Sequence, residues 1–105
     1  MEKMRLLVLV DMPVGTRHER KVRREFLELL FSQGFSELQD SVYGRIAESR
    51  SSAAACKKRL RQNAPELGTV RLFVMTEAQF RDGKLLAGTE SPQEREVGAA
   101  LDIFL

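Results

Sequence analysis

The chain has 105 residues, of which 43% are apolar and 30% charged, and its formal net charge is +2 at pH 7. This length predicts one domain, because ordinary domains peak at about 100–150 residues and a second core would not fit. The single cysteine excludes an intramolecular disulfide, and one histidine leaves no Cys/His zinc module. With no signal-peptide pattern and no apolar run of about 20 residues, the sequence predicts a soluble, cytoplasmic protein without a membrane partner.

The first predicted element is a buried strand over residues 5–10, read from the apolar run RLLVLV. A helix is predicted over residues 17–33, where apolar positions recur at helical spacing. Thr16 and Glu19 form a capping box at its start. Gly34 supplies the left-handed stop expected just after its end.

Residues 35–47 alternate loosely and predict two short strands or one bent strand pair, with Gly44 as a possible bulge or bend. A short amphipathic helix is predicted over residues 53–64, with Ser49, Ser51 and Ser52 as candidate N-caps. A second strongly apolar strand follows at residues 69–76. Its alternation places Val70, Leu72 and Val74 on one face and Arg71, Phe73 and Met75 on the other.

This order predicts an α+β fold, in which residues 1–88 form a ferredoxin-like βαββαβ domain with two helices on one face of an antiparallel sheet. Both faces of the strand at residues 69–76 are apolar, so we expect a homodimer to cover the open face of the sheet. Residues 89–105 predict a polar hinge and an additional C-terminal strand, ALDIFL. We expect this strand to dock on a sheet edge across the dimer.

Positive charge is concentrated in the two predicted helices and their first turns. Residues 1–71 hold 14 Lys and Arg against 9 Asp and Glu, whereas residues 72–105 hold 3 against 6. The planar guanidinium group of arginine can bind a phosphate through two hydrogen bonds, so these clusters favour a polyanion as partner. The alternative is that the basic residues only solvate exposed helix faces. The candidate nucleic-acid-binding side chains are Arg17, Arg20, Lys21, Arg23, Arg24, Lys57, Lys58 and Arg61.

Asp11 is the most suggestive single residue, because it directly follows a buried strand and its carboxylate could project into a loop-lined site. The alternative interpretation is an ordinary turn aspartate at a strand end. One carboxylate is a poor Mg²⁺ site, but a symmetric dimer could bring two copies of Asp11 to one metal ion.

The other candidate groups favour structural roles. His18 is more consistent with a solvated helix residue or a phosphate contact than with a general base, because no orienting carboxylate can be identified. Cys56 lies on the apolar face of its predicted helix and is interpreted as a small core residue, not a nucleophile. Tyr43 and Phe73 could stack on bases, but core packing is favoured.

Four segments, RLLVLVDMP, TRHERKVRREFLELLFSQGF, LQDSVYGRI and GTVRLFVMTEAQF, resemble in their order and spacing the CRISPR-associated Cas2 proteins, particularly the short form found beside type II effectors. The resemblance runs from about residue 4 to the C-terminus. It implies a ferredoxin-like homodimer whose sheets face one another and whose C-terminal strands are exchanged.

The resemblance also implies two possible functions. The first is CRISPR spacer acquisition, in which a structural DNA-binding dimer bridges two dimers of the Cas1-type CRISPR integrase and supports the prespacer duplex. The alternative is an endonuclease for RNA or DNA that uses Mg²⁺ or another divalent cation, with Asp11 as the catalytic and metal-binding residue across the dimer axis. Many relatives carry tyrosine immediately before this aspartate, whereas this chain has Val10, which favours the structural function.

Overall fold

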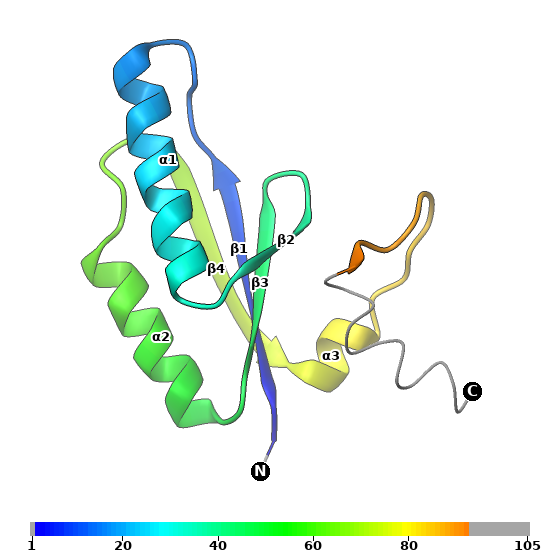
Figure 1. The fold of residues 1–105 in the computed structure, drawn as a ribbon. Coiled ribbons are helices and arrows are strands. Elements are labelled where there is room, and N and C mark those ends of the chain that lie inside the picture. The colour runs from blue at the N-terminus through cyan, green and yellow to red at the C-terminus, as the bar shows by residue number, and fades with distance from the viewer. Residues whose placement is uncertain (1, 93–105) are drawn as a thin grey trace.

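The computed structural model of the protein describes residues 2–92. Its elements are β1 (Met4–Asp11), α1 (Arg17–Ser32), β2 (Ser36–Gln39), β3 (Val42–Ala47), α2 (Arg50–Gln62), β4 (Thr69–Thr76) and α3 (Glu77–Arg81). The first six follow the predicted order βαββαβ, which confirms the α+β prediction (Figure 1). The short helix α3 was not predicted.

The four strands form one antiparallel sheet in the order β2-β3-β1-β4, and α1 and α2 lie on the same face of it (Figure 1). This is the ferredoxin-like arrangement, with β1 in the interior of the sheet and β4 at one edge. Residues 93–105, which hold most of the predicted hinge and the C-terminal strand, lie outside the described residues, so their docking stays a prediction. Between residues 2 and 92, no helix is long and apolar enough to cross a membrane.

The core lies between the helices and the sheet face formed by alternate residues of β1. Leu6 and Val8 are almost fully buried there, against Phe26 and Leu30 of α1 and Leu60 of α2. Each such side chain contributes about 1.5–3 kcal/mol when it is fully removed from water. The apolar periodicity of both predicted helices therefore identified the faces that hold the fold together.

The helix ends follow the local signals in the sequence closely. The Thr16 backbone N–H donates to the Glu19 carboxylate at 2.8 Å and the Glu19 N–H donates to Thr16 Oγ1 at 3.0 Å, which completes the predicted capping box. Gly34 adopts φ +87°, as its place after α1 requires. Ser49 is the one of the three candidate caps that is used, because its Oγ accepts from the Ser52 N–H, and α2 therefore begins at Arg50.

The prediction of a bulge at Gly44 is wrong. The register shift lies instead in β2, between Glu37 and Gln39. Gly44 is regularly paired with Leu7, and a Cβ at this position would lie 2.6 Å from Leu38 Cδ1. Glycine is therefore needed here because the Leu38 side chain packs directly over the backbone of β3.

Helix α3 covers one end of the sheet face that α1 and α2 leave open. The Arg5 guanidinium donates to the Glu77 carboxylate through Nε at 3.0 Å and Nη2 at 2.9 Å, and its Cζ lies 3.9 Å from the Phe80 ring centroid. Arg5 is 3% exposed and Glu77 is 7% exposed. A second capping box, between Thr76 and Gln79, starts this helix and was the sequence signal for it.

The rest of the open face presents apolar side chains to solvent. Leu9 is 37% exposed and Phe73 46%, and both belong to the face opposite the helices. Because residues directly opposite in an antiparallel pair share a face, the register places Phe73 beside Leu7 and Arg71 beside Leu9. The predicted division of β4 into two faces is confirmed. The prediction of core packing is confirmed for Tyr43 but is wrong for Phe73 within this chain, because its face of the sheet is not covered there by a helix.

Candidate nucleic-acid interface

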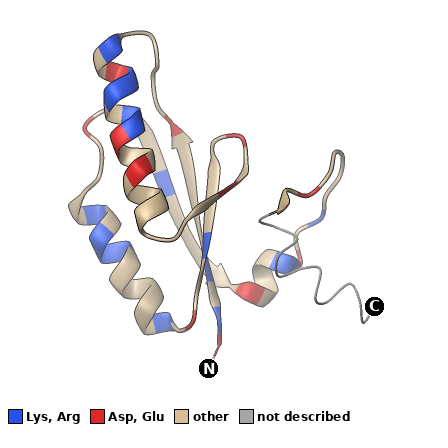
Figure 2. Cartoon of the chain, in the orientation of Figure 1, with Lys and Arg blue, Asp and Glu red and all other residues tan. Residues whose placement is uncertain are grey.

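Helix α2 presents the strongest concentration of positive charge. It contains five Lys and Arg residues and no Asp or Glu. Figure 2 shows that most of the basic residues lie in the second half of α2, with no acidic residue between them. The side chains of Lys57, Lys58 and Arg61 line one shallow hollow together with Ala54 and Gln62. Within residues 2–92 these three cations make no ion pair, so their charge is available to a ligand.

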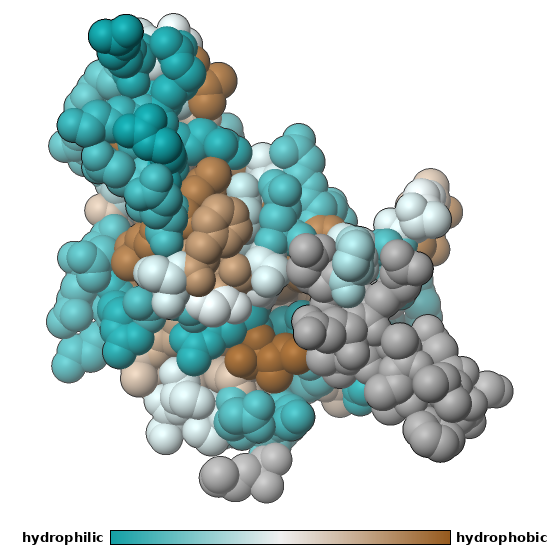
Figure 3. All heavy atoms as spheres, in the orientation of Figure 1, coloured by the Kyte–Doolittle hydropathy of each residue, from teal (hydrophilic) through white to brown (hydrophobic). Residues whose placement is uncertain are grey.

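Most of the predicted basic cluster on α1 has partners within the described chain. Lys21 lies 3.9 Å from Glu25 and Arg24 lies 3.8 Å from Glu28, both as i,i+4 ion pairs. Arg20 Nη1 donates to the Val14 carbonyl at 3.0 Å. The surface over the upper part of α1 remains strongly hydrophilic (Figure 3), but its net charge is lower than that of α2. Arg17 is exposed and forms no ion pair in the described part of the chain.

Arg23 differs from the other basic residues of α1 because its side chain is half-buried and interacts with Tyr43. It belongs to a small polar group around Tyr43, whose hydroxyl donates to Glu37 Oε2 at 3.2 Å. Burial raises the pKa of Tyr43, and the Glu37 charge and hydrogen bond raise it further, whereas Arg23 acts in the opposite direction. Arg23 therefore has an interaction within the fold, and its role in nucleic-acid binding stays a prediction.

The Tyr43 hydroxyl should make stability fall at alkaline pH. A folded-state pKa above the ordinary value of about 10 gives a contribution that is complete below pH 10 and is lost as the pH rises through the folded pKa. Urea unfolding between pH 7 and pH 11 should show wild type losing stability relative to Tyr43→Phe above about pH 10. If the free energies of unfolding of wild type and Tyr43→Phe change equally between pH 7 and pH 11, the raised pKa of Tyr43 is contradicted.

The remaining sequence candidates occupy unremarkable places. His18 is exposed on the first turn of α1, and its Nε2 lies 3.4 Å from Glu66 Oε1, on the loop that leads to β4. Cys56 is 1% exposed in the core, which confirms its structural role. Glu66 is a carboxylate beside His18 that the sequence did not identify, but both side chains are mostly exposed, as expected of a solvated helix residue.

Asp11 is the last residue of β1 and its side chain is exposed. The backbone around it is fixed by Gly68, which has φ +82° and lies so close that a Cβ there would be 2.7 Å from the Asp11 carbonyl oxygen. Only glycine combines this conformation with this approach. The carboxylate is therefore presented from a rigid strand end on the open face of the sheet.

Arg71 is a further candidate, which was not predicted from the sequence. It is exposed, it is paired with Leu9, and it therefore lies diagonally from Asp11 on the same sheet face. The sequence could have indicated it, because alternation along the strand places Arg71 on the same face as Phe73 and Met75. A charged side chain on an otherwise apolar face is typical of a binding residue. A cation here could contact a phosphate close to the Asp11 carboxylate.

The residues of one chain do not fit a divalent metal ion by themselves. No group of three or more His, Cys, Asp or Glu side chains that could hold a metal exists among residues 2–92. Asp11 is a single carboxylate on an open surface, whereas Mg²⁺ usually needs one or two carboxylates together with water and substrate oxygens. A metal site at Asp11 would have to include a second copy of the chain or the nucleic acid.

Fold and charge together define a class of protein, the ferredoxin-like α+β domains with a basic helix layer suited to a polyanion. The family model described as CRISPR associated protein Cas2 matches residues 4–82. The chain belongs to the Cas2 family.

Relatives support this assignment at the level of sequence. A protein from Acidovorax ebreus named CRISPR-associated endoribonuclease Cas2 is 40% identical over 97 residues, which cover 92% of this chain and 95% of the relative. A protein of the same name from Lacticaseibacillus rhamnosus is 36% identical over 92 residues, or 88% and 91% of the two chains. The crystal structure of Streptococcus pyogenes Cas2 at pH 6.5 has a TM-score of 0.57 at 24% identity, covers 79% of this chain and 99% of that chain, and supports the fold.

Proposed function

We propose that this protein is a structural DNA-binding subunit of CRISPR spacer acquisition, a homodimer that supports the prespacer duplex between two dimers of the Cas1-type integrase. The observation that carries the proposal is the basic face of α2, where Lys57, Lys58 and Arg61 are exposed and form no ion pair in the described chain. Such a surface binds phosphates through charge without reading sequence, as a support for arbitrary duplexes must.

The homodimer is supported by the open face of the sheet. Leu9 and Phe73 are large apolar side chains on that face, and both are more than one third exposed. Helix α3 closes the end near Arg5, which leaves the half of the face near Asp11 for a second copy. In such a dimer the two basic helix layers would lie on opposite outer surfaces, where a duplex can reach them.

The experiment that tests the DNA-binding role compares two double variants of equal charge. Lys57→Gln with Lys58→Gln should weaken binding of a short DNA duplex and reduce the slope of log K against log salt by about 0.9 for each phosphate that the variant no longer neutralises. Lys21→Gln with Arg24→Gln removes the same charge from residues that are already paired with Glu25 and Glu28, so its slope should change less. Fluorescence anisotropy over a series of NaCl concentrations measures both.

The comparison has clear contrary outcomes. Equal slopes for wild type and the α2 double variant would mean that α2 binds no phosphate, and the proposal would fail. A larger loss of affinity in the α1 double variant would move the interface to α1. The oligomeric state of every variant is checked first by light scattering, so that a broken dimer is not mistaken for weaker phosphate binding.

A metal-dependent endonuclease is the second candidate function. It is favoured by the exposed Asp11 carboxylate at a rigid strand end, and by relatives that carry the name endoribonuclease. We propose that two copies of Asp11, brought together by the dimer, would hold Mg²⁺ or another divalent cation there. The substrate class under this proposal is RNA or DNA.

A further inference from the structure

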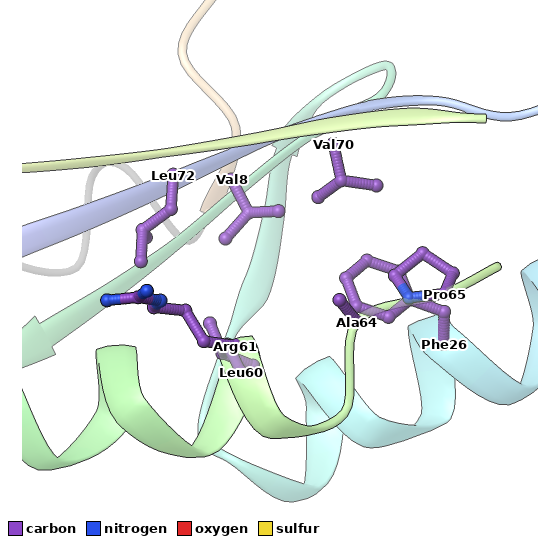
Figure 4. Close-up of a pocket in the computed structure, with 8 residues that line it drawn as sticks. All are labelled: Val8, Phe26, Leu60, Arg61, Ala64, Pro65, Val70 and Leu72. Carbon is purple, nitrogen blue, oxygen red and sulfur yellow. The ribbon is translucent and has the colours of Figure 1, made fainter. Parts of the chain in front are cut away.

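A small apolar cavity lies between the sheet and the end of α2. Val8, Val70 and Leu72 point into it from the sheet, and Leu60 and Ala64 lie opposite them, as Figure 4 shows. Its volume is about 120 Å³. An engineered cavity of about 150 Å³ with a similar lining binds benzene, so this one can hold a single aliphatic or aromatic side chain.

The lining decides which kind of ligand suits the cavity. Arg61 is the only lining side chain with a polar end, and the buried side chains of the described residues leave no polar atom without a partner. A nucleobase placed there would bury donors and acceptors without hydrogen-bond partners, which costs free energy. An apolar side chain has no such cost, so the cavity favours a protein over a nucleic acid as occupant.

The positive charge around the cavity indicates which residues should flank the inserted side chain of the partner. Arg61 lines both the cavity and the shallow hollow that contains Lys57 and Lys58. In Figure 4 its guanidinium extends beside the cavity, below Leu72. Because α2 carries no acidic residue, a segment with carboxylates next to its apolar side chain would complement this surface.

We propose that the cavity is an anchor site for an acidic segment of a partner protein, which inserts one leucine or aromatic side chain and pairs a neighbouring carboxylate with Arg61. This site goes beyond the proposed DNA-binding role and does not depend on it. Because Arg61 lines both the cavity and the basic hollow on α2, the same face of the helix can bind either a protein segment or a DNA duplex.

The test uses the full chain and two fluorescein-labelled peptides. One has a leucine between two pairs of aspartates, and the other has serine in place of that leucine. The leucine peptide should bind at least about 10-fold more tightly, because leucine burial is the only difference. Ala64→Leu fills the cavity and should remove this preference, while Arg61→Gln should weaken binding of both peptides.

Controls separate the site from general charge attraction and from the DNA-binding role. Arg50→Gln removes the same charge from the far end of α2 and should leave the leucine preference unchanged. Ala64→Leu changes no charge, so duplex binding should persist in it even when the peptide preference is removed. Methyl NMR of wild type should show shifts at Val70 and Leu72 with the leucine peptide, which tests the site independently of any variant's folding.

Two results would overturn the proposal. Equal affinity for the leucine and serine peptides would mean that the surface attracts acidic chains through charge alone. Nuclear Overhauser contacts between the methyl groups of Val70 or Leu72 and residues 93–105 in the free protein would mean that the chain's own segment occupies the cavity.

Discussion

Under the proposed nuclease function, replacing Asp11 by asparagine should abolish divalent-dependent cleavage of RNA or DNA, while duplex binding stays at the wild-type level. The amide keeps the shape of the side chain but removes the negative charge that a divalent cation requires. Electrostatic stabilisation at such a centre is worth at least about 100-fold in rate, so the fall in rate should be far outside assay error. Single-turnover cleavage of a labelled strand, with Mg²⁺ and with chelator, measures it.

Asp40→Asn is the matched control, because Asp40 is also an exposed aspartate but lies in the turn between β2 and β3. It should cleave as wild type does. Full activity in Asp11→Asn would show that the cleavage does not depend on Asp11 and would end the proposal of a catalytic metal site there. If Asp11→Asn supports integration by the cognate integrase as wild type does, the proposed structural function does not need the carboxylate.

The fold was largely predictable because its signals are local. The apolar run of β1, the capping box at Thr16 and the left-handed Gly34 are each set by neighbouring residues, and each was found where the sequence indicated. The role of Gly44 was misread because glycine has two uses in strands, a bulge or a close approach. Only the position of Leu38, across the strand pair, decides between them.

The candidate site was less predictable, because it depends on which charges remain free after folding. Two arginine-rich clusters of similar size are visible in the sequence, but the structure engages Lys21, Arg24 and Arg23 with acidic or buried partners. The sequence indicated this only through the i,i+4 spacing of Lys21 to Glu25 and of Arg24 to Glu28. No local pattern links Arg5 to Glu77, because their pairing forms only when β4 lies beside β1.

Breaking the Arg5–Glu77 pair should be the most destabilising single change on the open sheet face. Both residues are almost fully buried and joined by two hydrogen bonds. Glutamine at position 77 keeps one acceptor oxygen but leaves the Arg5 charge buried without a counter-charge and sets an NH2 donor against one of its N–H groups. We expect Glu77→Gln to lower the free energy of unfolding by about 3 kcal/mol, which is a large part of the stability of a domain this size. Urea unfolding at one fixed protein concentration measures this change.

A matched control exists in the Glu2 carboxylate, which accepts from Arg50 at 3.1 Å in an exposed ion pair. Glu2→Gln makes the same chemical change and should cost at most about 1 kcal/mol, because water screens an exposed pair. Arg5→Met combined with Glu77→Leu should recover most of the stability, since apolar side chains need no partners there. Equal destabilisation in Glu2→Gln and Glu77→Gln would show that burial does not strengthen this ion pair. If the double variant stays as unstable as Glu77→Gln, the docking of α3 depends on the charge pair itself.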